Sequence, residues 1–372
     1  MAVSTRLVDL IQDSIDVFVN ERRHELQSIA PELTEVLDLA QQFLAGGKRF
    51  RGLFCYWGWQ SVRPKHADHD THDAQAALEL PGIVRAAAAL EVFHAAALIH
   101  DDIMDKSDTR RGALSAHRRF EAMHAGSSWT GNAADFGTSA ALLLGDLLLG
   151  WSDELFDQAT AALPTGDHGR AGRKEFSTMR TEVTAGQYLD ILEENAWATY
   201  PETDALSRAH RVIVYKSAKY SVEAPLVIGG ALGGADENQI AALRAFGLPL
   251  GVAYQLRDDL LGVFGDPDVT GKPAGDDLRE GKRTVLIALT RSKLASGIRT
   301  MVDELIGDPN LDGEQIAMLR SAIVDSGAVD EVEQIISHNV ALAHAAIAQA
   351  AITSAARTQL IQLTDTVTRR TA

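Results

Sequence analysis

The chain has 372 residues, of which 46% are hydrophobic, enough to fill the core of one large domain or two ordinary ones. Its formal net charge of −16 argues against nucleic-acid binding by bulk electrostatics. A single cysteine, Cys55, excludes an intramolecular disulfide framework and favours a reducing cytoplasm.

Neither secretion nor membrane insertion is expected. The N-terminal stretch reaches acidic residues too soon for a signal peptide. The most apolar stretches are interrupted by Glu91 and His94, or by Asp146, and none reaches the roughly 18 uninterrupted apolar residues that a bilayer requires. We therefore expect a cytoplasmic protein without a transmembrane segment.

Apolar residues recur at helical spacing along almost the whole chain, and β-branched alternating runs are scarce. The pattern predicts helices over residues 5–27, 33–45, 49–61, 74–105, 133–161, 171–194, 204–232, 236–265, 282–293, 298–307, 313–325 and 328–368. Nothing resembles an internal repeat or a long linker. We expect one all-α domain spanning residues 1–372, a bundle of long helices whose interior can hold a ligand and a metal.

Residues 62–73, between the third and fourth predicted helices, alternate His66, His69 and His72 with aspartates. Zinc ligands are usually more regularly spaced, so an exposed loop is expected here in preference to a metal site.

The first basic segment in chain order is Gly46-Gly47-Lys48-Arg49-Phe50-Arg51-Gly52. Glycines there leave backbone N–H groups open to an anion, and the N-terminus of the following helix adds positive potential. The spacing is not that of a P-loop. A helix break with solvated basic residues remains the alternative.

An acidic cluster ends the fourth predicted helix, at Asp101, Asp102 and Asp105. Residues four apart share a helix face, so Asp101 and Asp105 are expected to point the same way. Carboxylates at the C-terminal end of a buried helix oppose its dipole and need a cation, and their hard oxygens suit Mg²⁺. Arg110 and Arg111 follow, and offer planar forks either to phosphate oxygens or to these carboxylates.

A second acidic cluster, Asp258 and Asp259, precedes two segments that contain glycine and lysine, Gly271-Lys272-Pro273 and Gly281-Lys282-Arg283-Thr284. Lys216-Ser217 offers a further positive charge, although a lone lysine on a helix is more often solvated. The two clusters together suggest a diphosphate held between two magnesium-binding helices.

In this order the motifs resemble the trans-isoprenyl diphosphate synthase (polyprenyl synthetase) family, and within it the actinobacterial geranylgeranyl diphosphate synthases. The resemblance rests on G-G-K-R-x-R at 46–51, H-x-x-x-L-I-H-D-D-x-x-D at 94–105, R-R-G at 110–112, K-S at 216–217, Y-Q-L-R-D-D at 254–259, G-K-P at 271–273 and G-K-R-T at 281–284. Two positions depart from the family pattern. Gly262 replaces the last aspartate of the second D-D-x-x-D motif, which leaves a metal role for Asp266 uncertain, and Gly52 replaces a proline.

The resemblance implies a helical bundle around a deep central cavity, a homodimer, and Mg²⁺-dependent prenyl transfer from allylic diphosphates to isopentenyl diphosphate. It implies that isopentenyl diphosphate is bound by Lys48, Arg51, His94 and Arg111. It places at the allylic diphosphate Arg110, Lys216, Ser217, Gln255, Lys272 and Lys282. It assigns Mg²⁺ to Asp101, Asp105 and Asp258, with Asp102 and Asp259 completing or orienting that shell.

The resemblance also bears on product length. In this family, bulky residues four and five positions before the first aspartate close the cavity beneath the growing chain. Here these positions hold Ala97 and Ala96, so a product longer than fifteen carbons is expected. Phe93 would form a deeper floor, which implies geranylgeranyl diphosphate. The alternatives are a longer-chain polyprenyl diphosphate synthase, a class I terpene cyclase, a head-to-head squalene- or phytoene-type synthase, and a non-catalytic regulatory subunit.

Overall fold

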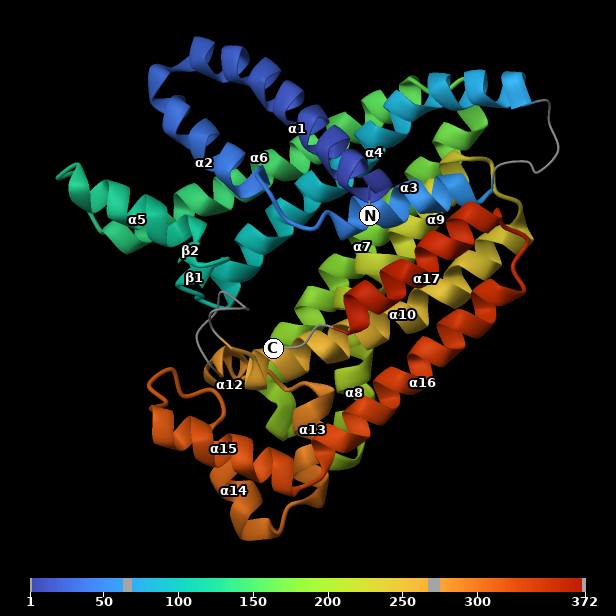
Figure 1. Ribbon diagram of the computed structural model, residues 1–372. Coiled ribbons are helices and arrows are strands. Elements are labelled where there is room, and N and C mark those ends of the chain that lie inside the picture. The colour runs from blue at the N-terminus through green and yellow to red at the C-terminus, as the bar shows by residue number, and fades with distance from the viewer. Residues whose placement is uncertain (1, 63–68, 267–274, 370–372) are drawn as a thin grey trace. The chain divides into compact units, whose positions relative to one another are not determined.

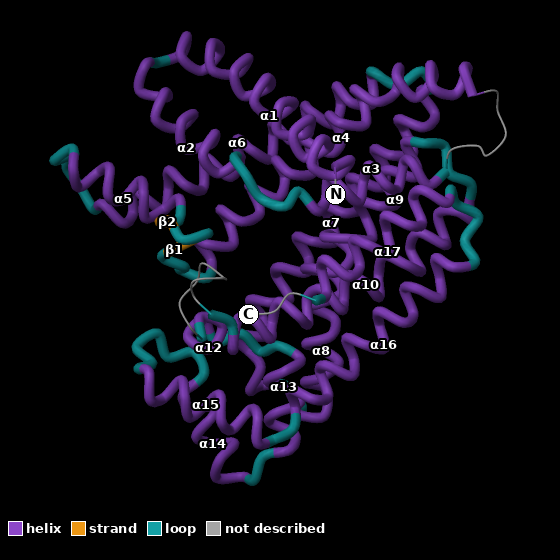
Figure 2. Tube along the Cα trace, viewed as in Figure 1, coloured by secondary structure: helices purple, strands orange, loops and turns teal. Residues whose placement is uncertain are grey.

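The computed structural model describes residues 2–62, 69–266 and 275–369, and these form helices almost throughout (Figures 1 and 2). The all-α class predicted from the sequence is confirmed. The N-terminal half contains α1 (Ala2–Ile29), η1 (Pro31–Leu33), α2 (Thr34–Leu44), α3 (Phe50–Ser61), α4 (His69–Met104), β1 (Thr109–Arg110), β2 (Ala113–Leu114), α5 (Ala116–Gly126), α6 (Ala133–Ala161) and α7 (Gly166–Ala196). The remainder contains η2 (Trp197–Thr199), η3 (Glu202–Asp204), α8 (Ala205–Val212), the π-helix η4 (Ile213–Glu223), α9 (Ala224–Leu232), α10 (Glu237–Phe264), α12 (Asp276–Glu280), α13 (Val285–Lys293), α14 (Ser296–Leu305), α15 (Gly313–Asp325), α16 (Ala328–Ala348) and α17 (Ser354–Thr368).

Several element boundaries differ from the prediction. Helix α5 and the short β1–β2 hairpin occupy a stretch for which no element was predicted. The predicted helix 204–232 divides into α8, η4 and α9, and the predicted helix 328–368 is interrupted after Ala348. The predicted loop at 62–73 is partly wrong, because α4 begins at His69, whereas residues 63–68, with His66, lie outside the described residues.

The chain divides into two compact units, residues 1–175 with 225–236, and residues 176–224 with 237–372. The expectation of a single domain over 1–372 stays a prediction. In the first unit, α4 is the central helix: it packs on α1, α3 and α6, and α5 lies along α6 (Figure 1). Its residues Ala86–Leu90 are completely buried, because small side chains allow the neighbouring helices to approach closely.

The segment 225–236 belongs to the first unit because α9 packs backbone to backbone against α3. A Cβ on Gly58 would lie 2.1 Å from the carbonyl oxygen of Leu226, and a Cβ on Gly229 would lie 1.8 Å from that of Cys55. No side chain fits at either crossing. Cys55 is thereby buried, and burial raises the pKa of its thiol to about 12, which makes the thiol unreactive.

In the second unit, α10 is the central helix and packs on η4 and α16 (Figures 1 and 2). Its apolar residues join those of α13, α15 and α16 in one continuous core that includes Leu256, Leu286, Leu319 and Val332. Arg257 ties this core together: its guanidinium pairs with both carboxylate oxygens of Glu333 on α16, at 2.6 and 2.7 Å, and donates to the carbonyl of Thr368 on α17.

Two helices are apolar and long enough to cross a membrane by length and composition alone, Ala76–Met104 of α4 and Ala133–Ala161, which is α6. In α4, 78% of the apolar window is buried inside the protein, as expected for a core helix. In α6 only 28% of the window is buried, so this helix presents an apolar face that includes Leu142 and Leu143.

Candidate diphosphate and metal-binding sites

The two N-terminal basic motifs meet in the first unit. Gly47, whose φ of +91° is accessible mainly to glycine, lies beside Arg111: a Cβ on Gly47 would be 3.5 Å from Nη2 of that arginine. Lys48 is exposed and Arg51 is half-buried at the start of α3. The structure therefore brings together the motifs at 46–51 and 110–112, which the sequence separates by nearly sixty residues.

Arg49 holds this loop in place from inside. Its side chain is buried, its backbone is left-handed with a φ of 49°, and its guanidinium donates to Gln12 on α1 and to the carbonyl of Leu44. Glu91 on α4 lies 3.6 Å from Arg49 and also accepts the backbone N–H of Gly52 at 2.9 Å. The basic motif is thus fixed to α4 by a buried ion pair.

His94 lies one helical turn after Glu91 on α4. The pKa of His94 is well below its ordinary value, because the ring is withdrawn from water and because Arg51, Arg111 and other guanidiniums lie near it. The pKa of Arg111 is also lowered, by loss of hydration and by the charge of Arg49. Such mutual repulsion is relieved by an anion, so this cluster is suited to a diphosphate.

The first acidic cluster lies at the C-terminal end of α4. Asp102 is completely buried and accepts two hydrogen bonds from Arg110, one of them from Nε at 2.8 Å. Arg110 also approaches Asp101 at 3.6 Å. Asp101 and Asp105 are half-buried and one turn apart, joined by the backbone bond from Asp105 N–H to the Asp101 carbonyl at 2.8 Å. Of the two alternatives for Arg110, the structure shows the ion pair with carboxylates, and its contact with a diphosphate stays a prediction.

The β1–β2 hairpin presents both arginines. Arg110 pairs with Ala113 across the hairpin, and the turn is made by Arg111 and Gly112, whose φ values are 54° and 75°.

The three residues expected to set product length lie on α4, before the acidic cluster at its C-terminal end. Ala96 is completely buried, Phe93 is 4% exposed and Ala97 is half-buried.

The second acidic cluster lies near the end of α10 in the second unit. Asp258 is half-buried and Asp259 is 5% exposed. Gln255 donates to Oδ1 of Asp259 at 2.7 Å. The pKa of Asp259 is raised to about 8, mainly because the carboxyl group is buried. The hydrogen bond from Gln255 opposes this rise, and the nearby carboxylates of Asp277 and Asp258 contribute to it. Within the described part of the chain, Oδ2 of Asp259 is buried without a hydrogen-bond partner.

Lys216 and Ser217 lie on the π-helix η4, a conformation that is often associated with functional sites. Two glycines allow neighbouring helices to approach this segment. A Cβ on Gly186 of α7 would lie 2.3 Å from the backbone nitrogen of Lys216, and one on Gly251 of α10 would lie 2.4 Å from the Ala218 carbonyl. The ammonium of Lys216 pairs with Asp190 on α7. Ser217 is half-buried beside it.

Lys282, in the last basic motif, is connected to α10 through Asp277. Lys282 pairs with Glu280 at 2.7 Å and lies 3.9 Å from Asp277 on α12. A Cβ on Gly262 would lie 1.9 Å from Oδ2 of Asp277, so α12 presses this carboxylate against the second acidic motif. Lys272 lies outside the described residues, and Asp266 is exposed.

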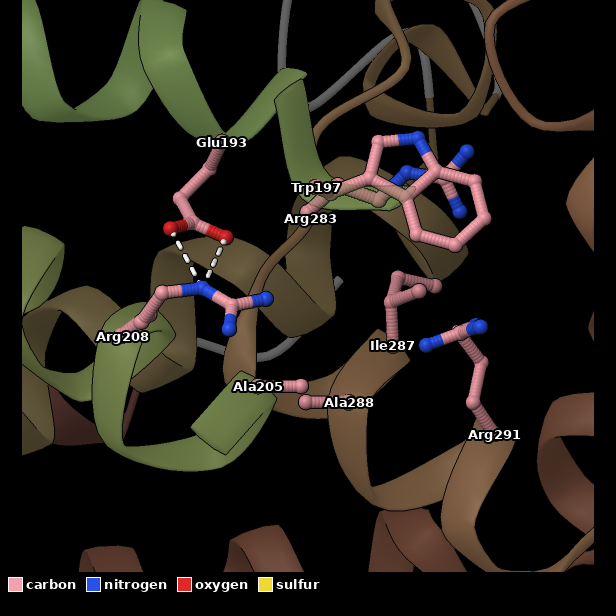
Figure 3. Close-up of a pocket in the computed structure, with 8 residues that line it drawn as sticks. All are labelled: Glu193, Trp197, Ala205, Arg208, Arg283, Ile287, Ala288 and Arg291. Carbon is pink, nitrogen blue, oxygen red and sulfur yellow. Dashed lines mark hydrogen bonds and ion pairs between the residues drawn. The ribbon is translucent and has the colours of Figure 1, made fainter. Parts of the chain in front are cut away.

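A stack of cations on Trp197 fixes the segment that carries Lys282. The guanidinium of Arg283 lies 4.0 Å from the centroid of the indole ring, and that of Arg291 lies 4.6 Å from it. Both arginines also pair with Asp303, at 3.4 and 2.6 Å. Figure 3 shows the small pocket that these residues line, with Arg208 held by Glu193 on its other side.

The donor chemistry at both clusters fits Mg²⁺. Among the described residues, no group of three or more His, Cys, Asp or Glu side chains forms a preassembled metal cage. Mg²⁺ does not need one, since it typically binds one or two carboxylates and completes its octahedron with water and substrate phosphate. A buried carboxylate oxygen without a hydrogen-bond donor, as in Asp259, is suited to a cation or to its bound water.

Comparison with known proteins decides the family. The polyprenyl synthetase family model matches residues 33–323. The chain belongs to the polyprenyl synthetase family. The structure is similar to the crystal structure of geranylgeranyl pyrophosphate synthase from Corynebacterium glutamicum complexed with isoprenyl diphosphate and magnesium, with a TM-score of 0.90, 35% identity, and coverage of 98% of this chain and 99% of that one.

Sequence relatives agree with the structural comparison. The geranylfarnesyl diphosphate synthase of Aeropyrum pernix is 34% identical over 247 residues, which cover 66% of this chain and 70% of that protein. The geranylfarnesyl diphosphate synthase of Natronomonas pharaonis is 30% identical over 332 residues, which cover 86% of this chain and 87% of that protein. The resemblance inferred from the motifs is thereby confirmed, and the chain is a prenyltransferase similar to geranylgeranyl diphosphate synthases.

Proposed function

We propose that this chain is a Mg²⁺-dependent prenyl diphosphate synthase that joins isopentenyl diphosphate head-to-tail to allylic diphosphates. The observation that supports it most is the meeting of two basic motifs beside Glu91 and His94, close to the acidic end of α4. This juxtaposition offers an anion site for one substrate next to carboxylates for the metal of the other.

The residues around His94 would bind isopentenyl diphosphate. Lys48, Arg51 and Arg111 carry the positive charge that a diphosphate requires. His94 stays neutral at physiological pH because its pKa is lowered, so its ring can donate one hydrogen bond without adding charge. Glu91 keeps the loop at residues 46–51 in position through its contacts with Arg49 and Gly52.

The acidic clusters and their basic neighbours would bind the allylic diphosphate. When bound, Mg²⁺ neutralises the diphosphate as the allylic C–O bond ionises. Asp101, Asp105 and Asp258 would hold it, with Asp102 and Asp259 orienting the site. The allylic diphosphate would be bound by Arg110, Lys216, Ser217, Gln255, Lys272 and Lys282. The isopentenyl double bond attacks the allylic cation, and the departing diphosphate takes the proton that is lost.

We propose geranylgeranyl diphosphate as the main product. Ala96 and Ala97 leave space below the first acidic motif, and Phe93, one turn deeper and buried, would end it. The named relatives include both geranylgeranyl and geranylfarnesyl synthases, so the twenty-carbon assignment depends on Phe93.

A class I terpene cyclase is the second candidate, since it also ionises an allylic diphosphate. It needs no isopentenyl diphosphate site, and the convergence of Gly47 and Arg111 therefore favours the synthase. A regulatory subunit was suggested by Gly262 alone. The family match and the named relatives, which are prenyl diphosphate synthases, favour an enzyme over a regulatory subunit.

We further propose a cytoplasmic homodimer. Leu142 and Leu143 on α6 are 49% and 67% exposed, and a second subunit would cover such an apolar face. The single, buried Cys55 is consistent with a reducing compartment.

The experiment that tests the proposed function replaces Asp101 with alanine. We expect Asp101→Ala to lose at least about 99% of prenyl transfer at saturating Mg²⁺, because one charged metal ligand is typically worth several kcal/mol to the transition state. The circular dichroism spectrum should be unchanged, since Asp101 is half-buried at a helix end. Retained activity at saturating Mg²⁺ would contradict the metal assignment.

A further inference from the structure

Three guanidiniums from different segments converge on one small pocket in the second unit. Arg208 reaches this pocket from α8, Arg283 from the segment before α13, and Arg291 from α13 itself (Figure 3). Their side chains are only 12%, 9% and 11% exposed. Charged side chains are almost never buried to this extent without a partner, so the three positive charges require negative charge close by.

The carboxylates that contact these arginines do not balance their charge. Glu193 accepts two hydrogen bonds from Nε of Arg208, at 2.8 and 3.1 Å. Asp303 pairs with Arg283 and with Arg291. Among the described residues, two carboxylates therefore face three guanidiniums, and one positive charge is left in excess around the pocket.

Arg283 has the weakest compensation of the three. Its hydrogen bonds to Asp303 and to the carbonyl of Ile306 are long, at 3.4 and 3.5 Å, and its buried Nε has no partner in the described part of the chain. The pKa of Arg283 is lowered to about 10, mainly by burial and also by Arg291, which lies against the same Trp197 ring. An anion in the pocket would offset this repulsion.

The size and lining of the pocket suit a compact oxyanion. Its volume is about 260 Å³, part of it open to solvent, which is below the range of about 300–1,000 Å³ for pockets that take drug-sized molecules. Ala205 and Ala288 line it between Arg208 and Arg291, and their small side chains leave the space open (Figure 3). Guanidinium groups bind the oxygens of phosphate in pairs, a geometry that chloride cannot use.

We propose that this pocket is a binding site for a compact oxyanion of the phosphate type, held by Arg208, Arg283 and Arg291. The proposal goes beyond the proposed function, because no residue that lines the pocket is assigned to a substrate or to Mg²⁺. Arg283 directly follows Lys282, so a bound oxyanion would also steady the segment that carries Lys282. The competing explanation is that the arginines only join α7, α8, α13 and α14 through their ion pairs.

The test measures the binding of inorganic phosphate without Mg²⁺ or prenyl substrates. The melting temperature is recorded against phosphate concentration at constant ionic strength, with chloride as the reference anion, and the apparent affinity is taken from the stabilisation. Inorganic diphosphate is titrated in the same way, to identify which oxyanion the pocket prefers. Crystals soaked in selenate, a tetrahedral oxyanion with an anomalous signal, show where the anion lies.

Two variants address the pocket and two serve as controls. Ala288→Leu fills the pocket without removing a charge, whereas Arg208→Gln removes one guanidinium. Arg299→Gln is the matched control in the same unit, because Arg299 pairs with an exposed carboxylate, that of Glu202. Arg111→Gln reports phosphate that binds at the basic motifs of the first unit.

We expect Ala288→Leu and Arg208→Gln each to weaken phosphate binding at least about tenfold, the first by excluding the anion and the second by removing charge-assisted hydrogen bonds. Arg299→Gln and Arg111→Gln should each change it by less than about twofold. Selenate should lie within hydrogen-bond distance of the guanidiniums in the pocket. If one pocket variant fails to fold, the other still provides the comparison.

Unchanged phosphate affinity in either pocket variant, or selenate found only beside Arg111, would overturn the proposal and leave the arginines as structural ion pairs. So would a wild-type protein that neither phosphate nor diphosphate stabilises more than chloride does. A pocket-dependent stabilisation that is stronger with diphosphate supports the site and names diphosphate as its ligand. Because no prenyl substrate is present, failure of the proposal leaves the proposed function unaffected.

Discussion

Glu91 offers a direct test of how the isopentenyl diphosphate site is held together. Replacing it by glutamine keeps an acceptor for the Gly52 N–H but removes the charge that faces Arg49. Both side chains are almost completely buried, 3% and 4% exposed, so solvent does not screen their interaction. A pair at such a separation is worth about 4 kcal/mol at an effective dielectric constant near 20.

The expected cost of Glu91→Gln is therefore about 3–5 kcal/mol in the free energy of unfolding, the usual range for a buried charge left without its partner. The loop that carries Lys48 and Arg51 should also loosen, and the KM for isopentenyl diphosphate should rise more than that for the allylic substrate. Urea unfolding with circular dichroism and two-substrate kinetics provide the two measurements.

Glu35→Gln is the matched control, because Glu35 is an exposed carboxylate in the same unit. It should change stability by less than about 0.5 kcal/mol. If Glu91→Gln were as stable as Glu35→Gln and bound isopentenyl diphosphate normally, the buried pair would not hold the basic motif, and the reasoning would be refuted.

Three further outcomes are expected. Ala96→Phe should shorten the main product to fifteen carbons, because Ala96 is completely buried below the acidic motif; an unchanged product on chromatography would remove Ala96 from the product-length assignment. The pKa of His94 is lower in the folded chain than in the unfolded chain. Below pH ~6.5 the unfolded chain therefore binds a proton at His94 that the folded chain does not bind. As a result, the free energy of unfolding falls by up to about 1.4 kcal/mol per pH unit as the pH drops from there. His94→Gln should flatten the pH dependence of stability between pH 7 and pH 5. A variant profile parallel to that of the unchanged protein would contradict the assignment of this dependence to His94. Leu143→Glu should convert a dimer to a monomer in light scattering, and a wild-type monomer would disprove the dimer.

Fold class and motif order were predictable because both depend on local sequence pattern. The 3.6-residue periodicity predicts α6 and α15 with the observed bounds, Ala133–Ala161 and Gly313–Asp325. The same periodicity failed at Lys216, because no propensity distinguishes a π-helix from an α-helix. The break after Ala348 was also missed, since the residues that follow it, beginning with Gln349, are compatible with a continuing helix.

Functional residue types were predictable, whereas their partners were not. The motif identifies Arg110 and Arg111 equally, but only the hairpin turn shows that Arg110 faces Asp102 while Arg111 faces Gly47. Glu91 was visible only as a charge that interrupts an apolar helix, and its buried pairing with Arg49 needed the fold.

Asp277 illustrates the same limit beside the second acidic cluster. In the sequence, Gly262 reads as a missing carboxylate, and Asp277 lies fifteen residues away in a segment rich in glycine and charge. Nothing in the local pattern indicates that α12 returns this carboxylate to α10. This contact arises from tertiary packing and is seen only as the steric conflict that a side chain at residue 262 would meet.

The most direct test of the proposed function incubates the purified chain with Mg²⁺, labelled isopentenyl diphosphate and each allylic primer in turn, and then sizes the dephosphorylated products. A labelled twenty-carbon alcohol as the main product is expected. Release of an unlabelled hydrocarbon from the primer alone, or no transfer of label with any primer, would contradict the assignment as a prenyl diphosphate synthase.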